Sequence, residues 1–361
     1  MLTSIRHIIR LVRAGRTLAR YDVLLPPQQV ADLPPLARFA LRLAKLGSRP
    51  PQNDPESRLT AALSALGPSY IKLGQFLATR PDIIGPERAF ELKALQDRLP
   101  PFDMEDAKSI IRKTLGGNID DFFTEFGEPV AAASIAQVHR ARTNDGKDVA
   151  VKVLRPGVER RFADDLQSFY FAARLIERFN AEGRRLRPVD AVKMLEQSMK
   201  LELDLRMEAS AMSELTENTR KDPGFRVPEV DWQRTGRQVL TTGWIEGTPI
   251  ADVAALRAAG FDLVKLGDTV IQSFLRHAIR DGFFHADMHP GNLFVDHDGT
   301  LVAVDFGITG RLGEKERMVL AEILYGFITR DYMRVSLVHF DVGYVPRHKD
   351  PADFAQALRA I

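Results

Sequence analysis

The segment between residues 284 and 307 constrains the fold of this chain most, because polar side chains flank a short strand-turn-strand pattern there. Strands are expected over Asn292 to Val295 and over Leu301 to Val304, around a turn at His297-Asp298-Gly299. Asp287 lies five positions before Asn292, and Asp305 follows the second strand. Such a hairpin can present oxygen ligands from both of its sides, and carboxylate and amide oxygens are ligands that Mg²⁺ accepts.

The spacing of these residues is that of the protein-kinase catalytic loop, H-R-D-L-x-x-x-N, and Asp305-Phe306-Gly307 stands in the place of D-F-G. The resemblance implies phosphoryl chemistry. Asn292 and Asp305 would bind Mg²⁺, and Asp287 would act as a base or orient the attacking hydroxyl or water.

Two histidines in this segment, His285 and His289, are four positions apart and could suggest a metal pair. Pro290-Gly291 would break any helix that carried both, and no third ligand is near. His285 is therefore expected to brace the loop.

A lysine on a strand lies upstream. Lys152 ends the run Val149-Ala150-Val151-Lys152, on a strand expected over Asp148 to Leu154. In kinases a lysine at this place reaches the nucleotide phosphates and needs a carboxylate partner. Glu208 is the first candidate for that partner, and Glu202 is the competitor. A strand lysine alone is typical of a solvated charge at a sheet edge. The order of these motifs along the chain is what indicates a kinase-like site.

Two features depart from the protein-kinase pattern. No A-P-E follows Gly307, and Lys315 to Phe327 reads as a helix, so the platform that holds a peptide substrate is missing. The phosphate loop has alanine where kinases have glycine, which removes the freedom of glycine to adopt positive φ angles and predicts a stiffer loop that binds phosphates differently. Its residues are Ala131, Ala132, Ala133, Ser134, Ile135, Ala136, Gln137 and Val138.

The strand end Trp244-Ile245-Glu246-Gly247 has two interpretations. Its backbone around Glu246 is the natural place for hydrogen bonds to adenine in a kinase-like fold, and it is equally compatible with a plain strand end.

The charge balance excludes several classes of protein. Fifty Lys and Arg against 48 Asp and Glu leave a net charge of +2, which gives no case for a nucleic-acid binder. The absence of cysteine excludes disulfides, thiolate zinc sites and a cysteine nucleophile. No apolar run reaches the length of a membrane-spanning helix.

The first 50 residues carry nine basic and two acidic side chains, a local charge of +7. An expected helix gathers apolar residues on one face and arginines on the other, the pattern of a helix lying in an anionic membrane surface. Docking on the protein's own body and a transit peptide are the alternatives. The apolar face has Leu2, Ile5, Ile9 and Val12, and the basic face has Arg6, Arg10, Arg13 and Arg20.

With these motifs in place, the chain resembles the UbiB family of kinase-like proteins, also called the ADCK family, which supports ubiquinone biosynthesis. Lys72-Leu73-Gly74-Gln75 matches the family's K-x-G-Q motif, and Glu202-Leu203-Asp204 matches its E-x-D. The resemblance implies that the helical extension folds over the site where a protein substrate would dock. Lys72 and Gln75 would then lie at the nucleotide phosphates, and Lys72 would approach Glu202 and Asp204 and gate the site. Glu208 is left as the partner of Lys152.

The expected fold is α+β, an atypical protein-kinase-like two-lobed fold with an N-terminal helical extension. The expected parts are a basic amphipathic segment over 1–50, a breaker-rich linker at 47–57, and the K-x-G-Q extension over 51–127. A small lobe with inserted helices follows over 128–246, and a helical large lobe over 247–361. Family members usually continue into a C-terminal hydrophobic membrane segment, so we expect that this chain is truncated.

The leading functional hypothesis is binding and slow hydrolysis of Mg-ATP at the cytoplasmic face of the inner membrane, in support of ubiquinone biosynthesis. Its expected partners are ATP and ADP, Mg²⁺, anionic membrane lipids, and ubiquinone-synthesis enzymes or isoprenoid intermediates. A kinase for an isoprenoid or lipid substrate is the second hypothesis. A nucleotide-regulated membrane scaffold without turnover is the third. The sequence leaves open whether a homodimer forms.

Overall fold

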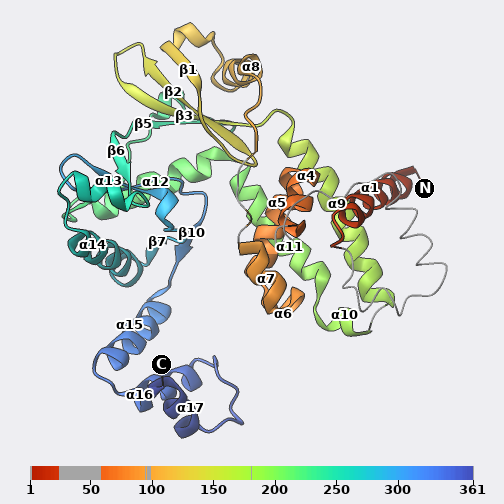
Figure 1. The fold of residues 1–361 in the computed structure, drawn as a ribbon, viewed down its shortest axis with the longest axis vertical. Helices are drawn as coiled ribbons and strands as arrows, with labels where there is room; N and C mark the ends of the chain where they lie inside the picture. Colours follow the sequence, from red (N-terminus) through yellow and green to blue (C-terminus); the bar gives the residue numbers. More distant parts are fainter. Residues whose placement is uncertain (1, 24–57, 94, 96–98, 180, 361) are drawn as a thin grey trace. The chain divides into compact units, whose positions relative to one another are not determined.

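The computed structural model describes residues 2–23, 58–93, 95, 99–179 and 181–360 (Figure 1). The expected linker at 47–57 lies outside the described residues. The chain divides into two compact units. The first unit comprises residues 1–205 and 232–241, and the second unit comprises residues 206–231 and 242–361.

The first unit contains a sheet with the strand order β1-β2-β3-β5. Both β1 with β2 and β2 with β3 pair antiparallel. Helix α8 (Met104–Leu115) begins at the cap residue Asp103, ends at the left-handed Gly116, and shares a hydrophobic core with the sheet. The strands are β1 (Phe123–Ala132), β2 (Ala136–Thr143), β3 (Asp148–Leu154) and β5 (Val239–Gly243).

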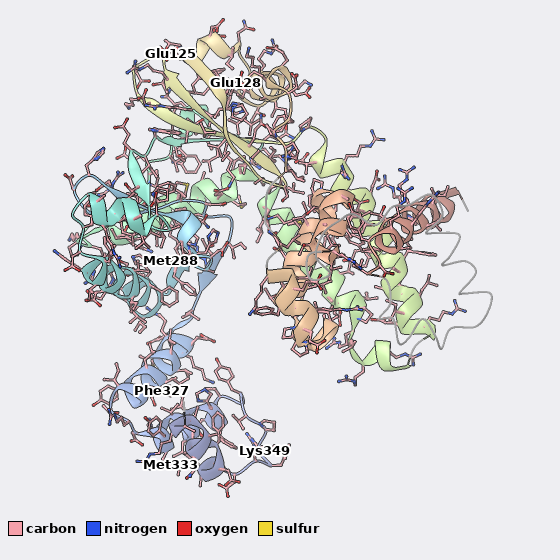
Figure 2. All side chains as sticks on the ribbon, viewed as in Figure 1. Glu125, Glu128, Met288, Phe327, Met333 and Lys349 are labelled. Carbon is pink, nitrogen blue, oxygen red and sulfur yellow. The ribbon has the colours of Figure 1, made fainter. Side chains whose placement is uncertain are left out.

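Strand β1 was not predicted, because its sequence is poor in strand-forming residues. It is an edge strand whose register with β2 shifts around Gly127 and Pro129, and proline is tolerated in a sheet mainly at an edge or a bulge. Glu125 and Glu128 project from it and are exposed (Figure 2). Charges of this kind protect an edge strand from pairing with another chain.

The rest of the first unit is helical. Helices α4 (Arg58–Leu66) and α5 (Pro68–Ala78) meet at Gly67, which has a φ of 96° and so breaks the helix. Helix α5 packs against α7 and α9, and α9 packs against α11 and α1 (Figure 1). The remaining helices are α1 (Leu2–Arg20), α6 (Pro81–Ile84), α7 (Pro86–Lys93), α9 (Val158–Phe179), α10 (Ala181–Arg185) and α11 (Pro188–Glu202).

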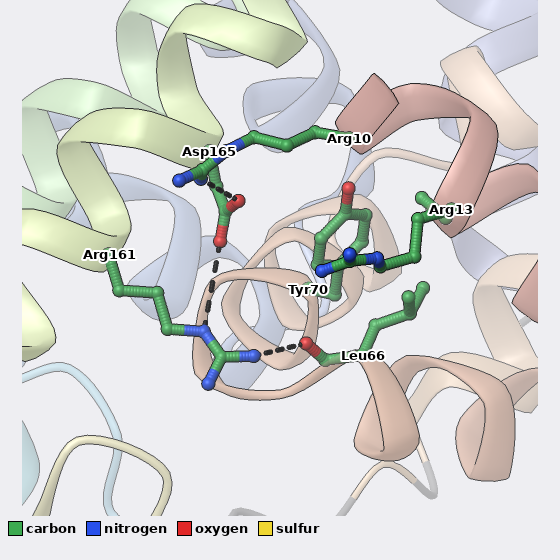
Figure 3. A pocket seen from close by; sticks show the side chains of 7 residues that line it. Arg10, Arg13, Leu66, Tyr70, Arg161 and Asp165 are labelled. Carbon is green, nitrogen blue, oxygen red and sulfur yellow. Dashed lines mark hydrogen bonds and ion pairs between the residues drawn. The ribbon is translucent and has the colours of Figure 1, made fainter. Parts of the chain in front are cut away.

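Helix α1 forms as expected and contacts α9 and α4. It does not pack on these helices through its apolar face, as an amphipathic helix docked on its own protein usually does. Arg10 is only partly exposed and pairs with Asp165 of α9 (Figure 3), and Ala14 is buried. Ile9 and Val12 are 54 % and 64 % exposed. The apolar face, in its described part, is therefore not the face that packs on the protein. The side chains of Leu2, Ile5 and Arg6 lie outside those described.

The second unit holds two small sheets. One has the strand order β4-β9-β8-β6, in which the hairpin β8–β9 is the expected strand pair, and the other pairs β10 with β7. The strands are β4 (Phe225–Arg226), β6 (Gly247–Pro249), β7 (Phe283–His285), β8 (Leu293–Asp296), β9 (Leu301–Ala303) and β10 (Thr309–Arg311).

The helices of this unit include a π-helix over Arg276–Asp281 that continues α14 and leads into β7. Asp350 is the N-cap of helix α17, and its side chain accepts from the Ala352 amide at 2.7 Å. The helices are α12 (Leu205–Thr219), α13 (Val253–Ala258), α14 (Leu263–Leu275), α15 (Glu314–Ile328), α16 (Tyr332–Asp341) and α17 (Pro351–Arg359). Among the described residues, no helix is both long and apolar enough to span a membrane.

Candidate functional site

The K-x-G-Q lysine forms an ion pair inside the first unit. The Nζ atom of Lys72 on α5 lies 2.6 Å from Oε2 of Glu202, the last residue of α11. The two side chains are only 12 % and 8 % exposed, so the ion pair offsets part of the cost of burying both charges. The expected approach of Lys72 to Glu202 is present. Its approach to Asp204, which follows α11, stays a prediction.

The glycine of the same motif is required by packing. A Cβ atom on Gly74 would lie 2.6 Å from Cδ2 of Leu95 and 2.7 Å from Cδ1 of Leu63. Both distances are too short for carbon atoms, so a side chain at this position would force the two leucine side chains or α5 itself to shift. Gln75 is half-buried on α5, and its role at the phosphates stays a prediction.

The alanine-rich loop is shorter than expected. Ala131 and Ala132 belong to β1 and Ala136 starts β2, so the turn consists of residues 133–135. The Ala133 amide donates to the Ala136 carbonyl at 2.8 Å and closes the turn. No residue of the turn has a positive φ, in agreement with the expected effect of alanine on this loop.

Arg155 fixes this turn and was missed by the sequence reasoning. Its Nε and Nη2 atoms donate to the Ala133 carbonyl at 2.9 and 2.8 Å, and Nη2 also donates to the Pro100 carbonyl at 2.9 Å. Its backbone amide donates to the Ile135 carbonyl at 2.8 Å. Only the position of Arg155, directly after β3, could have suggested this role.

Gln137 was assigned to the phosphate loop, yet its side chain is fully buried. Its Oε1 accepts from the Phe102 amide at 2.8 Å, and its Nε2 contacts the Phe102 carbonyl at 3.3 Å and Nε2 of His139 at 2.9 Å. These contacts hold residue 102 against β2.

Lys152 lies on β3 opposite Val138 of β2, as the V-A-V-K run predicted. Glu208 lies on α12 and is buried, with 7 % exposure. Lys152 belongs to the first unit and Glu208 to the second, so their pairing stays a prediction. Glu246 is exposed between β5 and β6, and its two interpretations both remain.

His285 joins the two halves of the catalytic-loop motif in the second unit. It is fully buried, its Nδ1 accepts from the Asp287 amide at 3.0 Å, and its Nε2 lies 3.0 Å from the Val304 carbonyl. An acceptor at Nδ1 requires the proton on Nε2, so the ring is neutral. Burial lowers the pKa of His285, which favours the same state. The expected bracing role is confirmed.

Asn292 ties the same two segments together. Its Nδ2 donates to the Asp287 carbonyl at 3.1 Å, and its backbone carbonyl accepts from the Val304 amide at 2.9 Å. The side chain is 8 % exposed. With Nδ2 engaged by the backbone, Oδ1 is the atom through which Asn292 can bind a cation.

The two aspartates are accessible to solvent. The Asp287 side chain is 47 % exposed, and its Oδ2 lies 3.9 Å from Nε2 of His289. Asp305 is exposed and has a φ of 59°, a left-handed backbone that is uncommon outside glycine. The buried Phe306 ring packs against His285 at 4.7 Å between ring centres and holds this backbone in place.

The donor set fits a magnesium ion that is also bound by phosphate. Within the described ranges, no group of three or more His, Cys, Asp or Glu is arranged to hold a metal alone. Asn292 and Asp305 offer hard oxygen atoms from two segments that are hydrogen-bonded to each other through Val304. Mg²⁺ is commonly bound by one or two carboxylates, substrate phosphates and water, so a small protein donor set is what this metal needs.

Comparison with known proteins defines the class. Residues 94–339 match the ABC1 atypical kinase-like domain. The chain therefore belongs to the ABC1 family of atypical kinase-like proteins, and its α+β kinase-like fold is established.

Individual relatives show a more specific similarity. The chain is 41 % identical over 360 residues to a protein of Marinobacter nauticus named "Probable protein kinase UbiB". The aligned region covers 98 % of this chain and 65 % of that relative. A protein of Pseudomonas putida with the same name is 40 % identical and matches 98 % of this chain and 67 % of its own length. The UbiB resemblance is confirmed, and the chain spans about two thirds of these relatives.

A solved structure shares the fold. The protein Rv3197 of Mycobacterium tuberculosis, determined in complex with erythromycin, has a TM-score of 0.60 at 24 % identity. The match covers 87 % of this chain and 76 % of that one.

Proposed function

We propose that this chain binds Mg-ATP and hydrolyses it slowly, in support of ubiquinone biosynthesis at the inner membrane. The observation that carries the proposal is the hydrogen-bond network around His285 and Asn292, which holds Asp287 and the Val304–Asp305 segment together. The name of the UbiB relatives supports the link to ubiquinone.

In the second unit, Asn292 Oδ1 and the Asp305 carboxylate would hold Mg²⁺, which supplies charge neutralisation at the phosphates. Asp287 would orient the attacking water and accept its proton, because its carboxylate is accessible while its backbone is fixed by His285 and Asn292. The neutral His285 would act only by positioning these groups.

In the first unit, Lys152 would bind phosphate oxygens. The turn at residues 133–135 would offer backbone groups to the nucleotide, held rigid by Arg155. Lys72 would gate the site. Its ion pair with Glu202 supports a closed resting arrangement, because separating the pair would leave two poorly solvated charges.

Association with the cytoplasmic face of the inner membrane is part of the proposal. Helix α1 has no acidic residue in its first turn, and it exposes Ile9 and Val12 beside Arg13 and Arg16. Exposed apolar side chains flanked by arginines suit an anionic lipid surface.

Calorimetric titration with Mg-ADP and Mg-ATP tests the nucleotide site. Asp305→Asn should abolish Mg²⁺-dependent binding, since it removes the charged ligand. Asp298→Asn is the matched control, because it makes the same change at an exposed turn of the same hairpin. Unaltered nucleotide and Mg²⁺ affinity in Asp305→Asn would show that the assignment is wrong.

One assay separates this proposal from its alternatives. On anionic liposomes, purified protein should release phosphate from ATP, and Asp287→Asn should stop the release. Transfer of label from ATP to an extracted lipid would instead identify a lipid kinase. Nucleotide binding without any Asp287-dependent turnover would indicate a scaffold.

A further inference from the structure

The two-stranded sheet of the second unit joins the two segments that carry the catalytic-loop motif. Strand β7 leads into the loop with Asp287, and strand β10 follows the segment with Asp305. The strands pair antiparallel, with Thr309 opposite His285 and Arg311 opposite Phe283. One end of this sheet therefore holds both aspartate segments, and Arg311 lies at the other end.

The Arg311 side chain is fixed from two directions. Its Nη1 atom donates to Oε1 of Glu214 at 2.8 Å, and its Nη2 atom donates to Oε2 of the same carboxylate. The central carbon of the guanidinium also lies over the ring of Phe283, 4.3 Å from the ring centre. Two parallel hydrogen bonds match a planar guanidinium to a carboxylate, and a lysine ammonium cannot reproduce this geometry. The contact therefore fixes an orientation of Glu214 in addition to attracting it.

This contact is too exposed to act mainly through stability. The side chains of Arg311 and Glu214 are 67 % and 35 % exposed. Ion pairs of such exposure contribute little to the free energy of unfolding. A precise geometry with a small effect on stability suits a residue that positions another element, and the element here is helix α12.

Helix α12 also carries Glu208, the expected partner of Lys152, six positions before Glu214. Six residues advance an α-helix by about 9 Å along its axis and turn it by about 240°, so the two glutamates lie on different faces. Glu208 is 7 % exposed, whereas Glu214 reaches strand β10. Because the helix is one rigid element, a rotation or slide that frees Glu214 would also displace Glu208.

A second contact ties the end of α12 to the segment before β7. On the π-helix, Nη1 and Nη2 of Arg280 donate to the two carboxylate oxygens of Asp222 at 2.6 and 2.9 Å. Nη2 also donates to the Asn218 carbonyl in α12 at 3.3 Å. The Asp222 side chain is only 6 % exposed. Arg280 thus anchors the end of the helix, and Arg311 adds an anchor one turn earlier, at Glu214. Two anchors on one helix restrain both its position and its rotation.

We propose that Arg311 is a positioning residue for ATP hydrolysis. Through Glu214 it holds α12, and with it Glu208, in a fixed relation to the strand pair that leads to Asp287 and Asp305. The inference rests on the proposed function, because it concerns the site at which Mg-ATP would be hydrolysed. Arg311 acts through Glu214 and takes no part in the chemical step. A misplacement of about 1 Å in such a site can lower a rate about a hundredfold.

The test is release of phosphate from ATP on anionic liposomes. Arg311→Gln should lower kcat about tenfold or more. Its affinity for Mg-ADP should change by less than about threefold, because the Mg²⁺ ligands are held by the His285 and Asn292 network. Its thermal midpoint should stay within about 3 °C, as expected for an exposed pair, so the loss of turnover would not come from unfolding.

Arg334→Gln is the matched control. Arg334 pairs with Glu322 at 2.6 Å in the same unit, and the two side chains are 55 % and 40 % exposed. The control removes an arginine of similar exposure from a pair that does not involve α12, and it should change kcat by less than about twofold. Equal kcat values in Arg311→Gln and Arg334→Gln would overturn the positioning role.

Exchanging the two charges tests whether Arg311 acts through Glu214. Arg311→Glu alone places two carboxylates at the contact and should lower kcat at least as much as Arg311→Gln. Arg311→Glu combined with Glu214→Arg restores a pair and should recover kcat to within about threefold of the unsubstituted chain. Arg311→Lys keeps the charge without the paired geometry and should recover only part. Absence of any recovery in the exchanged pair would refute a role through Glu214.

The outcomes separate this inference from the proposed function. If the unsubstituted chain released no phosphate in an Asp287-dependent way, the proposed function would fall and this inference with it. Normal Asp287-dependent release together with an unchanged kcat in Arg311→Gln would refute only the positioning role. If Arg311→Gln does not fold, Glu214→Gln removes the same contact from the other side and decides by the same comparison with Arg334→Gln.

Discussion

The candidate site residues of the first unit and those of the second are held by different kinds of contact. In the first unit, Lys72 and Glu202 come from helices far apart in the sequence and are joined by one buried ion pair. In the second unit, Asp287 and Asn292 are held within one short segment, by hydrogen bonds that involve backbone atoms. The first arrangement depends on two side chains at once. The second depends mainly on one neutral histidine and on chain geometry.

This difference predicts how a substitution lowers the stability of each unit. Loss of one partner of a buried ion pair strands a charge, whereas loss of a histidine leaves neutral backbone groups unpaired. The chain has two tryptophans, of which Trp232 belongs to the first unit and Trp244 to the second. Variants with Trp244→Phe or Trp232→Phe would therefore follow the unfolding of one unit at a time.

The largest effect is expected from Lys72→Met. It removes the ammonium group that lies 2.6 Å from the buried carboxylate of Glu202, and should lower the free energy of unfolding of the first unit by about 3–5 kcal/mol. Urea unfolding followed by Trp232 fluorescence measures it. Lys108→Met is the control, because its pair with Glu105 is an exposed surface pair, and it should cost less than about 1 kcal/mol.

A double variant sharpens this prediction. Lys72→Met with Glu202→Leu replaces both charges by apolar groups and should recover most of the lost stability. Equal stability of the single and the double variant would contradict the ion-pair explanation.

A smaller effect is expected from His285→Ala in the second unit. The change removes two hydrogen bonds and leaves a buried cavity, which together should cost about 2–4 kcal/mol. Urea unfolding followed by Trp244 fluorescence measures it, with the exposed His348→Ala as control. If Trp232 reported the loss and Trp244 did not, the histidine would not be the brace of the second unit.

The pH dependence should also differ between the units. Burial lowers the pKa of His139 in the first unit, and of His277 and His285 in the second. Below the ordinary histidine pKa of about 6.5, the unfolded chain binds protons that the folded chain rejects, so stability is full above this pH and falls as the solution is acidified.

Each histidine contributes a slope of at most about 1.4 kcal/mol per pH unit. The second unit should therefore lose stability more steeply on acidification, because it holds two of these buried histidines and the first unit holds one. Urea midpoints of the two single-tryptophan proteins, compared between about pH 7.5 and pH 5.5, measure this difference. Parallel loss in both proteins would count against the assignment of the buried histidines.

The smallest effects concern two glycines of the first unit. Gly74→Ala places a methyl group within 2.7 Å of two leucine side chains and should cost about 1–3 kcal/mol. Gly15→Ala is the matched control in α1, where no atom lies within 4 Å, and it should stabilise by about 0.5–1 kcal/mol. Thermal unfolding of both variants measures the effects, and a neutral Gly74→Ala would mean that α5 can shift away from α4.

The parts of the site that the sequence predicted are those made by neighbouring residues. The strands on both sides of residues 297–299 follow from strand-forming side chains around an Asp-Gly turn, and they place Asn292 and Asp305 without long-range information. The bracing role of His285 followed from the same local motif. Strand β1 was missed because an edge strand with glycine and proline carries little strand signal.

The parts that could not be predicted depend on contacts between distant segments. Nothing local shows that Arg155 reaches the Ala133 and Pro100 carbonyls, because many acceptors compete for a guanidinium group. The buried position of Gln137 was hidden for the same reason, since its partner Phe102 lies in a separate segment.

The sequence by itself determined the family, the kinase-like order of Lys152, Asp287 and Asp305, and the amphipathic character of α1. These properties reside in residue types and short spacings, which the backbone periodicity of helices and strands turns directly into structure. Only the tertiary structure decided that Arg10 turns toward α9 while Ile9 and Val12 are exposed. The physical reason is that a helix with arginines can satisfy them with carboxylates or with lipid, and only the position of Asp164 and Asp165 on α9 selects which arginine is paired.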